Sequence, residues 1–153
     1  MNYQGIGPRF VATVIDTILI MIPTCVLGFV IGGATGQTTE TGFSLQGASA
    51  FLYFLLSFLI WLGYYTLFEG LIGATPGKLA LKLRVVRIDG RPIGLQEALL
   101  RNVLRIVDGI FFYLVAAALV ATSPTKQRLG DRVAGTVVIG RTAPVPAQSG
   151  GAE

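Results

Sequence analysis

Two ionisable side chains mark the start of the first apolar segment of this chain. Arg9 stands at its edge, and Asp16 lies seven residues further on, inside the apolar run. Seven helical steps return to nearly the same face of a helix, about 10 Å along its axis. A carboxylate at the centre of a membrane helix costs about 2.5–3.5 kcal/mol on insertion scales, and less nearer the interface. We therefore expect Asp16 to face protein or a wet cavity, where it could pair with a cation or exchange a proton.

Four further charges would share one face of a later helix. Their spacings are four, four and three residues: Glu97, Arg101, Arg105 and Asp108. Glu97 and Arg101 form a favourable helical pair, and the last two charges form another. Arg101 and Arg105 repel each other unless an anion lies nearby, and we hypothesise that Asp16 supplies it; Asp108 and lipid phosphate are the other candidates. These charges could fix helix register and assembly, form a proton or cation pathway, or bind an anionic lipid or substrate.

The residue inventory excludes most enzymatic and metal chemistry. The chain has no histidine and a single cysteine, Cys25, which excludes Ser-His-Asp and Cys-His sites, His-ligated metals and an intrachain disulfide. A carboxylate pair could be drawn from Asp16, Asp108 and Asp131, but no nucleophile, metal ligand or cofactor motif accompanies it. We therefore expect a protein that is not an enzyme and that has no cofactor and no bound metal.

A loop from Gly73 to Lys78 resembles a phosphate-binding loop only superficially. The P-loop needs four residues between its glycines and Ser or Thr after the lysine. Here three residues separate the glycines, and a leucine follows the lysine. Thr75, Pro76 and Gly77 instead predict a tight turn that leaves the membrane. With Lys78 they would form a basic turn facing the lipid head groups.

The composition is that of a membrane protein. Of 153 residues, 52% are hydrophobic and 13% are charged, and the charged share is about half that of a soluble domain. This argues against a soluble, disordered or nucleic-acid-binding chain. Residues 17–39 and 41–68 contain no charge, and a membrane helix needs about 20 largely apolar residues. We predict spanning helices at about residues 8–33 and 48–68.

Basic residues are unevenly distributed between the connections. Residues 34–47 contain only Glu40 as a charge, whereas residues 70–97 contain five lysines and arginines. Because cytoplasmic loops carry the excess of Lys and Arg, we predict a cytoplasmic N-terminus in a multi-pass protein of the cell membrane. The net charge of +4 would also favour contact with a bilayer that carries anionic head groups.

The third segment, at about residues 95–122, allows two arrangements. Only residues 109–122 are strongly apolar, and a run of 10–14 residues is typical of a re-entrant or buried helix. The basic residues that follow favour the cytoplasm: Lys126, Arg128, Arg132 and Arg141. A bent segment would enter and leave on one side, whereas a true crossing would violate the charge rule.

Strand patterns favour the bent segment. We predict β segments at about residues 79–93 and 134–140: residues 79–87 alternate as a strand and are followed by the hairpin signal Asp89-Gly90, and residues 134–140 are rich in β-branched side chains. A lone hairpin is marginal in water, so we expect these strands to pair. Pairing requires both on one side of the membrane, which would place the C-terminus in the cytoplasm. The tail, residues 142–153, has the composition of a disordered segment.

Several short motifs occur in order along the chain: Arg9-Phe10-x-Ala12-x-x-x-Asp16, Gly73-x-Thr75-Pro76-Gly77-Lys78, Leu83-Arg84-Val85-Val86, Asp89-Gly90, Arg101 with Arg105, and Gln127 to Val138. Together they resemble the RDD family of small bacterial and archaeal membrane proteins, over about residues 5–141. The family name refers to one arginine and two aspartates, which Arg9, Asp16 and Asp131 match. The resemblance implies a transport role, because some members are linked to cation/proton exchange, and it names no substrate. From the residues themselves, we expect Asp131 to contribute more to stability if it is buried against Arg9.

The combined expectation is an all-α integral membrane protein with one membrane domain over residues 1–141. It has two transmembrane helices, a third broken or spanning helix and a small cytoplasmic β-rich cap. Because so few helices cannot readily enclose a conduit, we expect a homo-oligomer or a membrane protein partner. One possible function is monovalent cation/proton transport, with Asp16 titrating and Arg101 and Arg105 tuning it. The alternative is a non-transporting accessory or scaffold protein that binds anionic lipid or a protein partner.

Overall fold

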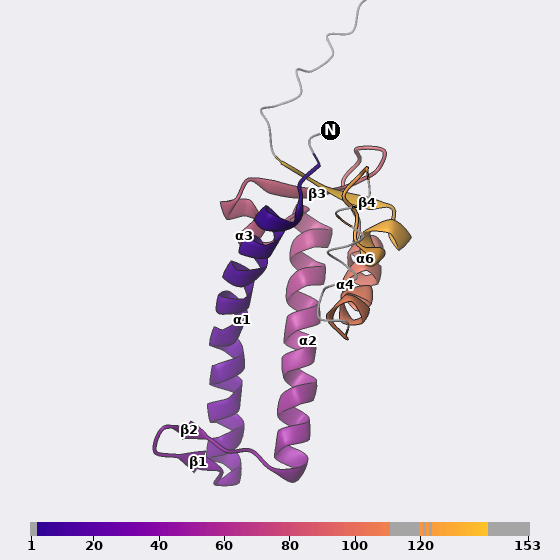
Figure 1. Cartoon of the computed structure of the whole chain (residues 1–153). Coiled ribbons are helices and arrows are strands. Elements are labelled where there is room, and N and C mark those ends of the chain that lie inside the picture. The colour runs from indigo at the N-terminus through magenta and orange to yellow at the C-terminus, as the bar shows by residue number, and fades with distance from the viewer. Residues whose placement is uncertain (1–2, 111–119, 121, 123, 141–153) are drawn as a thin grey trace, which may run out of the picture.

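Two long helices lie side by side and form most of the described chain (Figure 1). The structure is a computed structural model that describes residues 3–110, 120, 122 and 124–140. Helix α1 spans Ile6–Thr35 and helix α2 spans Gly47–Ile72. Both are long and apolar enough to cross a membrane, and most of their apolar side chains point away from the protein. They correspond to the two predicted spans but extend beyond them, so that Glu69 lies inside α2.

A short hairpin joins the two helices at one end of the molecule (Figure 1). Strand β1 (Thr38–Thr39) pairs in antiparallel fashion with β2 (Gly42–Phe43). The ring of Phe43 packs directly on Gly28 of α1, where a Cβ would overlap it. This hairpin was not predicted, because strands of two residues carry too little alternation to be recognised.

A second small sheet lies at the opposite end, where the N-terminus also lies (Figure 1). Strand β3 (Leu83–Arg87) pairs in antiparallel fashion with β4 (Thr136–Gly140), with Val85 opposite Val138. The two predicted strand regions therefore pair with each other, as the same-side arrangement requires. The hairpin expected at Asp89-Gly90 is reduced to a turn, in which Gly90 has φ 85° and residues 86 and 92 form an isolated bridge.

A short helix, α3 (Pro76–Ala80), stands where a tight turn was predicted. Thr75 caps it, because its side chain accepts a hydrogen bond from the backbone N–H of Lys78, and Pro76 occupies the first helical position. A proline fits there because its missing N–H would be unpaired in any case. The residues that predicted a turn, Thr75, Pro76 and Gly77, instead mark the start of this helix. Gly77 lets this helix contact α1, since a Cβ at Gly77 would overlap the carbonyl oxygen of Ala12.

Helix α4 (Leu95–Ile110) packs beside α2. Its polarity is inverted: it buries polar side chains and exposes apolar ones, which is the reverse of a helix on the surface of a soluble protein. Its buried face carries Ala98, Arg101, Asn102 and Arg105, whereas its exposed face carries Leu95, Leu99, Leu100, Val103 and Ile106. Such a helix matches an apolar solvent, because water would demand the reverse. The predicted third helix continues to residue 122, and residues 111–119 lie outside the described residues, as does the predicted disordered tail.

A small apolar core joins the sheet to the helices at this end. Its buried members come from α1, β3, the following loop, α4 and β4: Ala12, Leu83, Val85, Ile93, Ala98 and Val138. One more short helix, α6 (Leu129–Val133), precedes β4. The described chain thus has an apolar helix hairpin and, at one end of it, a packed layer that contains almost all of its buried polar groups.

Replacing Gly77 with alanine should destabilise the protein by about 1–3 kcal/mol, because the added methyl group overpacks the contact between α3 and α1. The measurement is equilibrium unfolding of the purified protein in mixed detergent micelles. Gly63→Ala in α2 is the matched control, since nothing lies within 4 Å of a Cβ at that position. Equal stability of the two variants would contradict this close packing.

Candidate functional site

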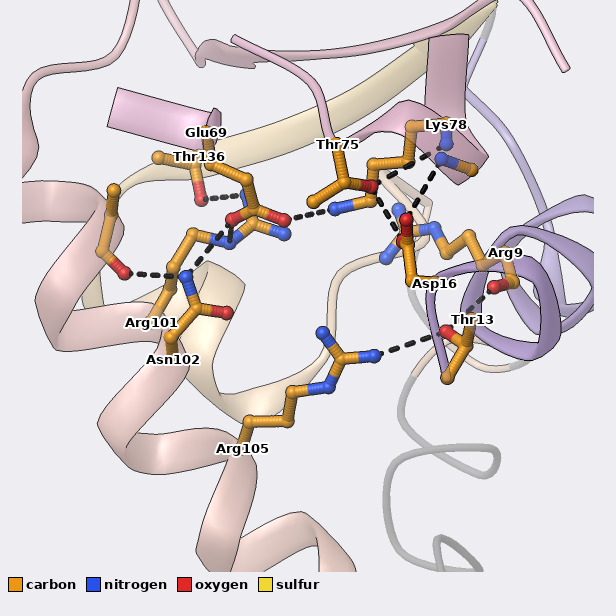
Figure 2. A network of polar contacts seen from close by, with 12 residues as sticks. Arg9, Thr13, Asp16, Glu69, Thr75, Lys78, Arg101, Asn102, Arg105 and Thr136 are labelled. Atoms are coloured by element: carbon orange, nitrogen blue, oxygen red, sulfur yellow. Dashed lines mark hydrogen bonds and ion pairs between the residues drawn. The ribbon is translucent and has the colours of Figure 1, made fainter. Parts of the chain in front are cut away.

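Five buried charges of alternating sign form a continuous chain at the end of the helix hairpin that carries β3 and β4. In order, its members are Arg9, Asp131, Arg101, Glu69 and Lys78. They come from α1, α6, α4, α2 and α3, so that five elements each contribute one charge. Each residue is at most 5% exposed. We call this set the charge chain, and Figure 2 shows most of it from close by.

Asp131 joins α1 to α4 within the charge chain. Its Oδ2 lies 2.7 Å from Nη1 of Arg9, and its Oδ1 lies 2.9 Å from Nη2 of Arg101. Asp131 stands in the first turn of α6, where its Oδ2 also accepts a hydrogen bond of 3.2 Å from the backbone N–H of Arg128. A carboxylate is favourable at this end of a helix. Burial of Asp131 against Arg9, which the sequence analysis considered as one possibility, is therefore present.

Glu69 joins the other half of the charge chain in the last turn of α2. Its Oε2 lies 3.1 Å from Nε of Arg101, and its Oε1 binds the ammonium group of Lys78. Asn102 donates a further hydrogen bond of 3.2 Å to Oε2. Glu69 is fully buried, so the two cations and the amide replace the water that its carboxylate would otherwise need.

Asp16 lies beside the charge chain and accepts three hydrogen bonds from neutral donors. Its Oδ1 accepts from the hydroxyl of Tyr64 and from the backbone N–H of Gly77, both at 2.8 Å. Its Oδ2 accepts from the hydroxyl of Thr75 at 2.6 Å. Asp16 is 1% exposed. A carboxylate from α1 thus anchors the first turn of α3, and Figure 2 shows it pointing toward Thr75.

Arg105 approaches Asp16 without forming a described contact with it. Its Nη2 donates a hydrogen bond of 3.0 Å to the hydroxyl of Thr13, which lies one turn before Asp16 on α1. The guanidinium carbon lies 4.1 Å from the ring centroid of Tyr65. This stacking places a cation over an aromatic face, which is favourable in dry surroundings.

The expected pairing of Asp16 with Arg101 or Arg105 is wrong for the described residues. Arg101 is instead occupied by two other acids, Glu69 and Asp131. The expected helical pair of Glu97 with Arg101 is also absent, because Glu97 binds Arg87 of β3 at 2.6 Å. The side chain of Asp108 lies outside the described residues. The helical spacing of these residues identified the helix face on which each charge lies. It could not identify the residues of other elements that pair with them.

The expectation that Lys78 faces lipid head groups is likewise wrong. Lys78 is 2% exposed, and Thr75 and Gly77 are buried with it. Its ammonium group points inward because α3 lies flat against α1 and Glu69 offers a buried carboxylate. Burial lowers the pKa of Lys78 to about 8, although the carboxylate of Glu69 raises it.

Glu69, Asn102 and Tyr64 are site residues that sequence reasoning missed. Glu69 comes directly after the charge-free stretch that ends at residue 68, where the predicted helix also ended. Its signal was that no glycine or proline separates it from the apolar helix, so the helix continues through it. Asn102 and Tyr64 carried no signal of their own, because neutral polar residues are common on helices.

The site offers carboxylate oxygens in dry surroundings. Among the described residues, no three His, Cys, Asp or Glu side chains converge as metal ligands. The three buried acids are held apart by the cations and hydroxyl groups between them. Oxygens of this kind can bind a proton or a small cation that displaces a neutral donor.

Neutralising Asp131 should cost about 3–5 kcal/mol of stability, because it leaves Arg9 and Arg101 buried without their shared carboxylate. We expect the double variant Arg9→Gln/Asp131→Asn to lose less than the sum of the two single variants when unfolding is measured in mixed micelles. Asp89→Asn, which alters an exposed pair, should change stability by less than about 1 kcal/mol. Additive losses for the first pair would show that it is not coupled.

The stabilisation from Asp131 should depend on pH in a defined direction. Burial raises the pKa of Asp131, but Arg101, Arg128 and Arg9 outweigh it and hold the pKa below 3.8. A depressed carboxyl pKa stabilises the folded state above the unfolded value, and this is lost as pH falls through the folded value. The stability difference between wild type and Asp131→Asn should therefore be constant above about pH 5 and shrink below pH 3.8. A difference that grows in acid would contradict this assignment.

Comparison with known proteins finds one protein family. The model of the RDD family matches residues 3–135, which include Arg9, Asp16 and Asp131. No curated protein and no solved structure matches the chain. The family match and the two apolar helices together indicate a membrane protein. On the extent of that match, the chain belongs to the RDD family.

Proposed function

We propose that this protein exchanges small monovalent cations for protons across a membrane, and that Asp16 is the carboxylate at which the two compete. The observation that carries the proposal is the difference between Asp16 and the other buried acids. Glu69 and Asp131 each contact two cationic side chains. The described contacts of Asp16 are all with neutral donors.

A carboxylate held by neutral donors keeps its negative charge without an ion pair to a neighbouring side chain. In a dry site this charge attracts a proton or a small cation much more strongly than it would in water. Glu69 and Asp131 could accept either ion only by giving up an arginine or lysine. Asp16 could do so by releasing a hydroxyl group, which costs far less and reverses easily.

The depth of Asp16 also suits this role. It lies ten residues after Ile6, the first residue of α1, which corresponds to about 15 Å along the helix axis. The apolar face of α4 is exposed on the same end of the molecule, which supports a hydrocarbon environment around this level. A titratable group at that depth is a candidate for an ion pathway by default.

We propose that an ion reaches Asp16 from the side on which Tyr64 lies. Thr75 and Gly77 are buried, whereas Tyr64 is half-buried. Movement of the Tyr64 hydroxyl would therefore expose Oδ1 of Asp16 with little change elsewhere. Two apolar helices cannot enclose a conduit, so we propose that several copies of this chain, or a partner, complete the pathway.

A second candidate function is that of a non-transporting scaffold. The observation that favours it is the charge chain itself, which ties five elements together and could serve assembly alone. In that case Asp16 would be a cap for α3, and the protein would co-purify with a fixed membrane partner. Its exposed basic residues would contact anionic lipid or that partner.

Asp16→Asn should abolish exchange while the protein still folds. An asparagine keeps the size of the side chain and one acceptor oxygen, but it cannot take up a proton or hold a cation by charge. Purified protein in liposomes with an internal pH-sensitive dye should show proton movement driven by a gradient of Na⁺ or K⁺. We expect at least a tenfold loss in the variant, with unchanged assembly by size-exclusion chromatography.

Asp89→Asn is the matched control, because it removes the same charge from an exposed turn, and it should leave exchange unchanged. Full activity in Asp16→Asn would remove Asp16 from the mechanism. Absence of flux in the wild type, together with a constant co-purifying partner, would favour the scaffold.

A further inference from the structure

An open groove of about 200 Å³ lies where α2 ends and α3 and β3 begin, and it is lined by Ile72, Ala74, Leu79, Leu83 and Arg84. It is separate from the charge chain, whose residues do not line it. The groove is therefore a feature of the outer surface at the end of the helix hairpin. Its lining combines an apolar wall with a cationic edge.

The apolar wall is continuous with the apolar surface of α2. Ile72 is 48% exposed and Leu79 is 42% exposed, and the neighbouring Leu71 is 70% exposed. Leu71 and Ile72 form the last turn of an apolar helix long enough to cross a membrane. The groove thus begins at the level where the hydrocarbon region of a bilayer would end.

The cationic edge differs from the other exposed basic groups nearby. Arg87 and Arg91 are engaged by acids, Glu97 and Asp89 respectively. Within the described part of the chain, Arg84 and the adjacent Lys82 form no ion pair, and both side chains are exposed. Two exposed cations beside an apolar wall match an amphiphile that has an anionic head.

The backbone at Lys82 supports the same reading. Lys82 has φ 54°, a left-handed conformation that residues with a side chain adopt infrequently. Unfavourable backbone conformations tend to persist where they serve a site. Here the bend directly precedes β3 and lies between Leu79 and Leu83, which both line the groove, and the backbone N–H of Lys82 donates a hydrogen bond of 3.0 Å to the carbonyl oxygen of Leu79.

We propose that this groove binds a membrane phospholipid with an anionic head group. An acyl chain would lie along Ile72, Leu79 and Leu83, and the phosphate would contact the guanidinium of Arg84 and the ammonium of Lys82. Arginine suits a phosphate because its planar donors match the oxygens. A phospholipid carries its apolar and anionic parts in this same order along the membrane normal, which a free phosphate ion does not.

The test uses the full-length protein, purified in detergent and examined by native mass spectrometry. Phosphatidylglycerol and phosphatidylcholine with identical acyl chains are the two probes. A basic residue near an anionic surface contributes roughly fivefold in affinity, so Lys82→Gln/Arg84→Gln should weaken phosphatidylglycerol retention by about 25-fold. Phosphatidylcholine retention should change less than twofold.

Arg91→Gln/Arg132→Gln is the matched control, because it removes two exposed cations that neither line the groove nor adjoin a lining residue in the sequence. It should leave the retention of both lipids within twofold of wild type. Leu79→Asn tests the apolar wall and should weaken both lipids alike. Excess inorganic phosphate should not displace phosphatidylglycerol.

Four results would overturn the proposal: equal retention of the two lipids by the wild type, an equal loss in the control variant, displacement by inorganic phosphate, or a lipid-free dimer that Leu79→Asn dissociates. The last would assign the groove to a second copy of this chain. None of these outcomes depends on transport, so the proposed lipid site and the proposed exchange at Asp16 stand or fall separately.

Discussion

A charge leaves water for a dry interior only when opposite charges and hydrogen bonds replace its hydration. Three cations and three acids meet this requirement together here. Arg9, Asp131, Arg101, Glu69 and Lys78 alternate in sign along one chain of contacts, and the third acid, Asp16, lies beside this chain and is held by neutral donors. Since each charge in the chain comes from a different helix, the elements cannot be placed independently. The position of α6 depends on Arg9 of α1, and that of α3 depends on Glu69 of α2.

Such a network is a poor choice if stability alone is required. Buried ion pairs can often be replaced by well-packed apolar side chains with no loss, or with a gain, of stability. Side chains such as leucine would also suit a protein whose outer surface is apolar throughout α1, α2 and α4. The network does provide a unique arrangement, because a shifted helix would leave a charge unpaired in dry surroundings. It also lies beside Asp16, whose described contacts are with neutral donors alone.

The two spans and the strands β3 and β4 could be predicted from the sequence because each rests on a local pattern. A charge-free stretch and an alternating run are visible within about 20 residues. The partners of the charges could not be predicted in this way. Arg9 and Asp131 lie 122 positions apart, and their contact was anticipated only as one possibility. Asp16 was assigned to an arginine because spacing shows which face a charge occupies but not which element packs against it. Lys78 was taken as lipid-facing for the same reason, since nothing near it in the sequence revealed the carboxylate of Glu69.

The inverted polarity of α4 connects the charge chain to the apolar surface around it. In water, Leu95, Leu99 and Ile106 would turn inward and the arginines outward, and the charge chain would lose its central member, Arg101. In hydrocarbon, the same helix gains nothing by burying its leucines but gains greatly by turning Arg101 and Asn102 toward Glu69. The solvent around the protein therefore helps to hold Arg101 between its two acids. A lipid environment is in this sense part of the site, because the packing of α4 depends on hydrocarbon as much as on the acids it contacts.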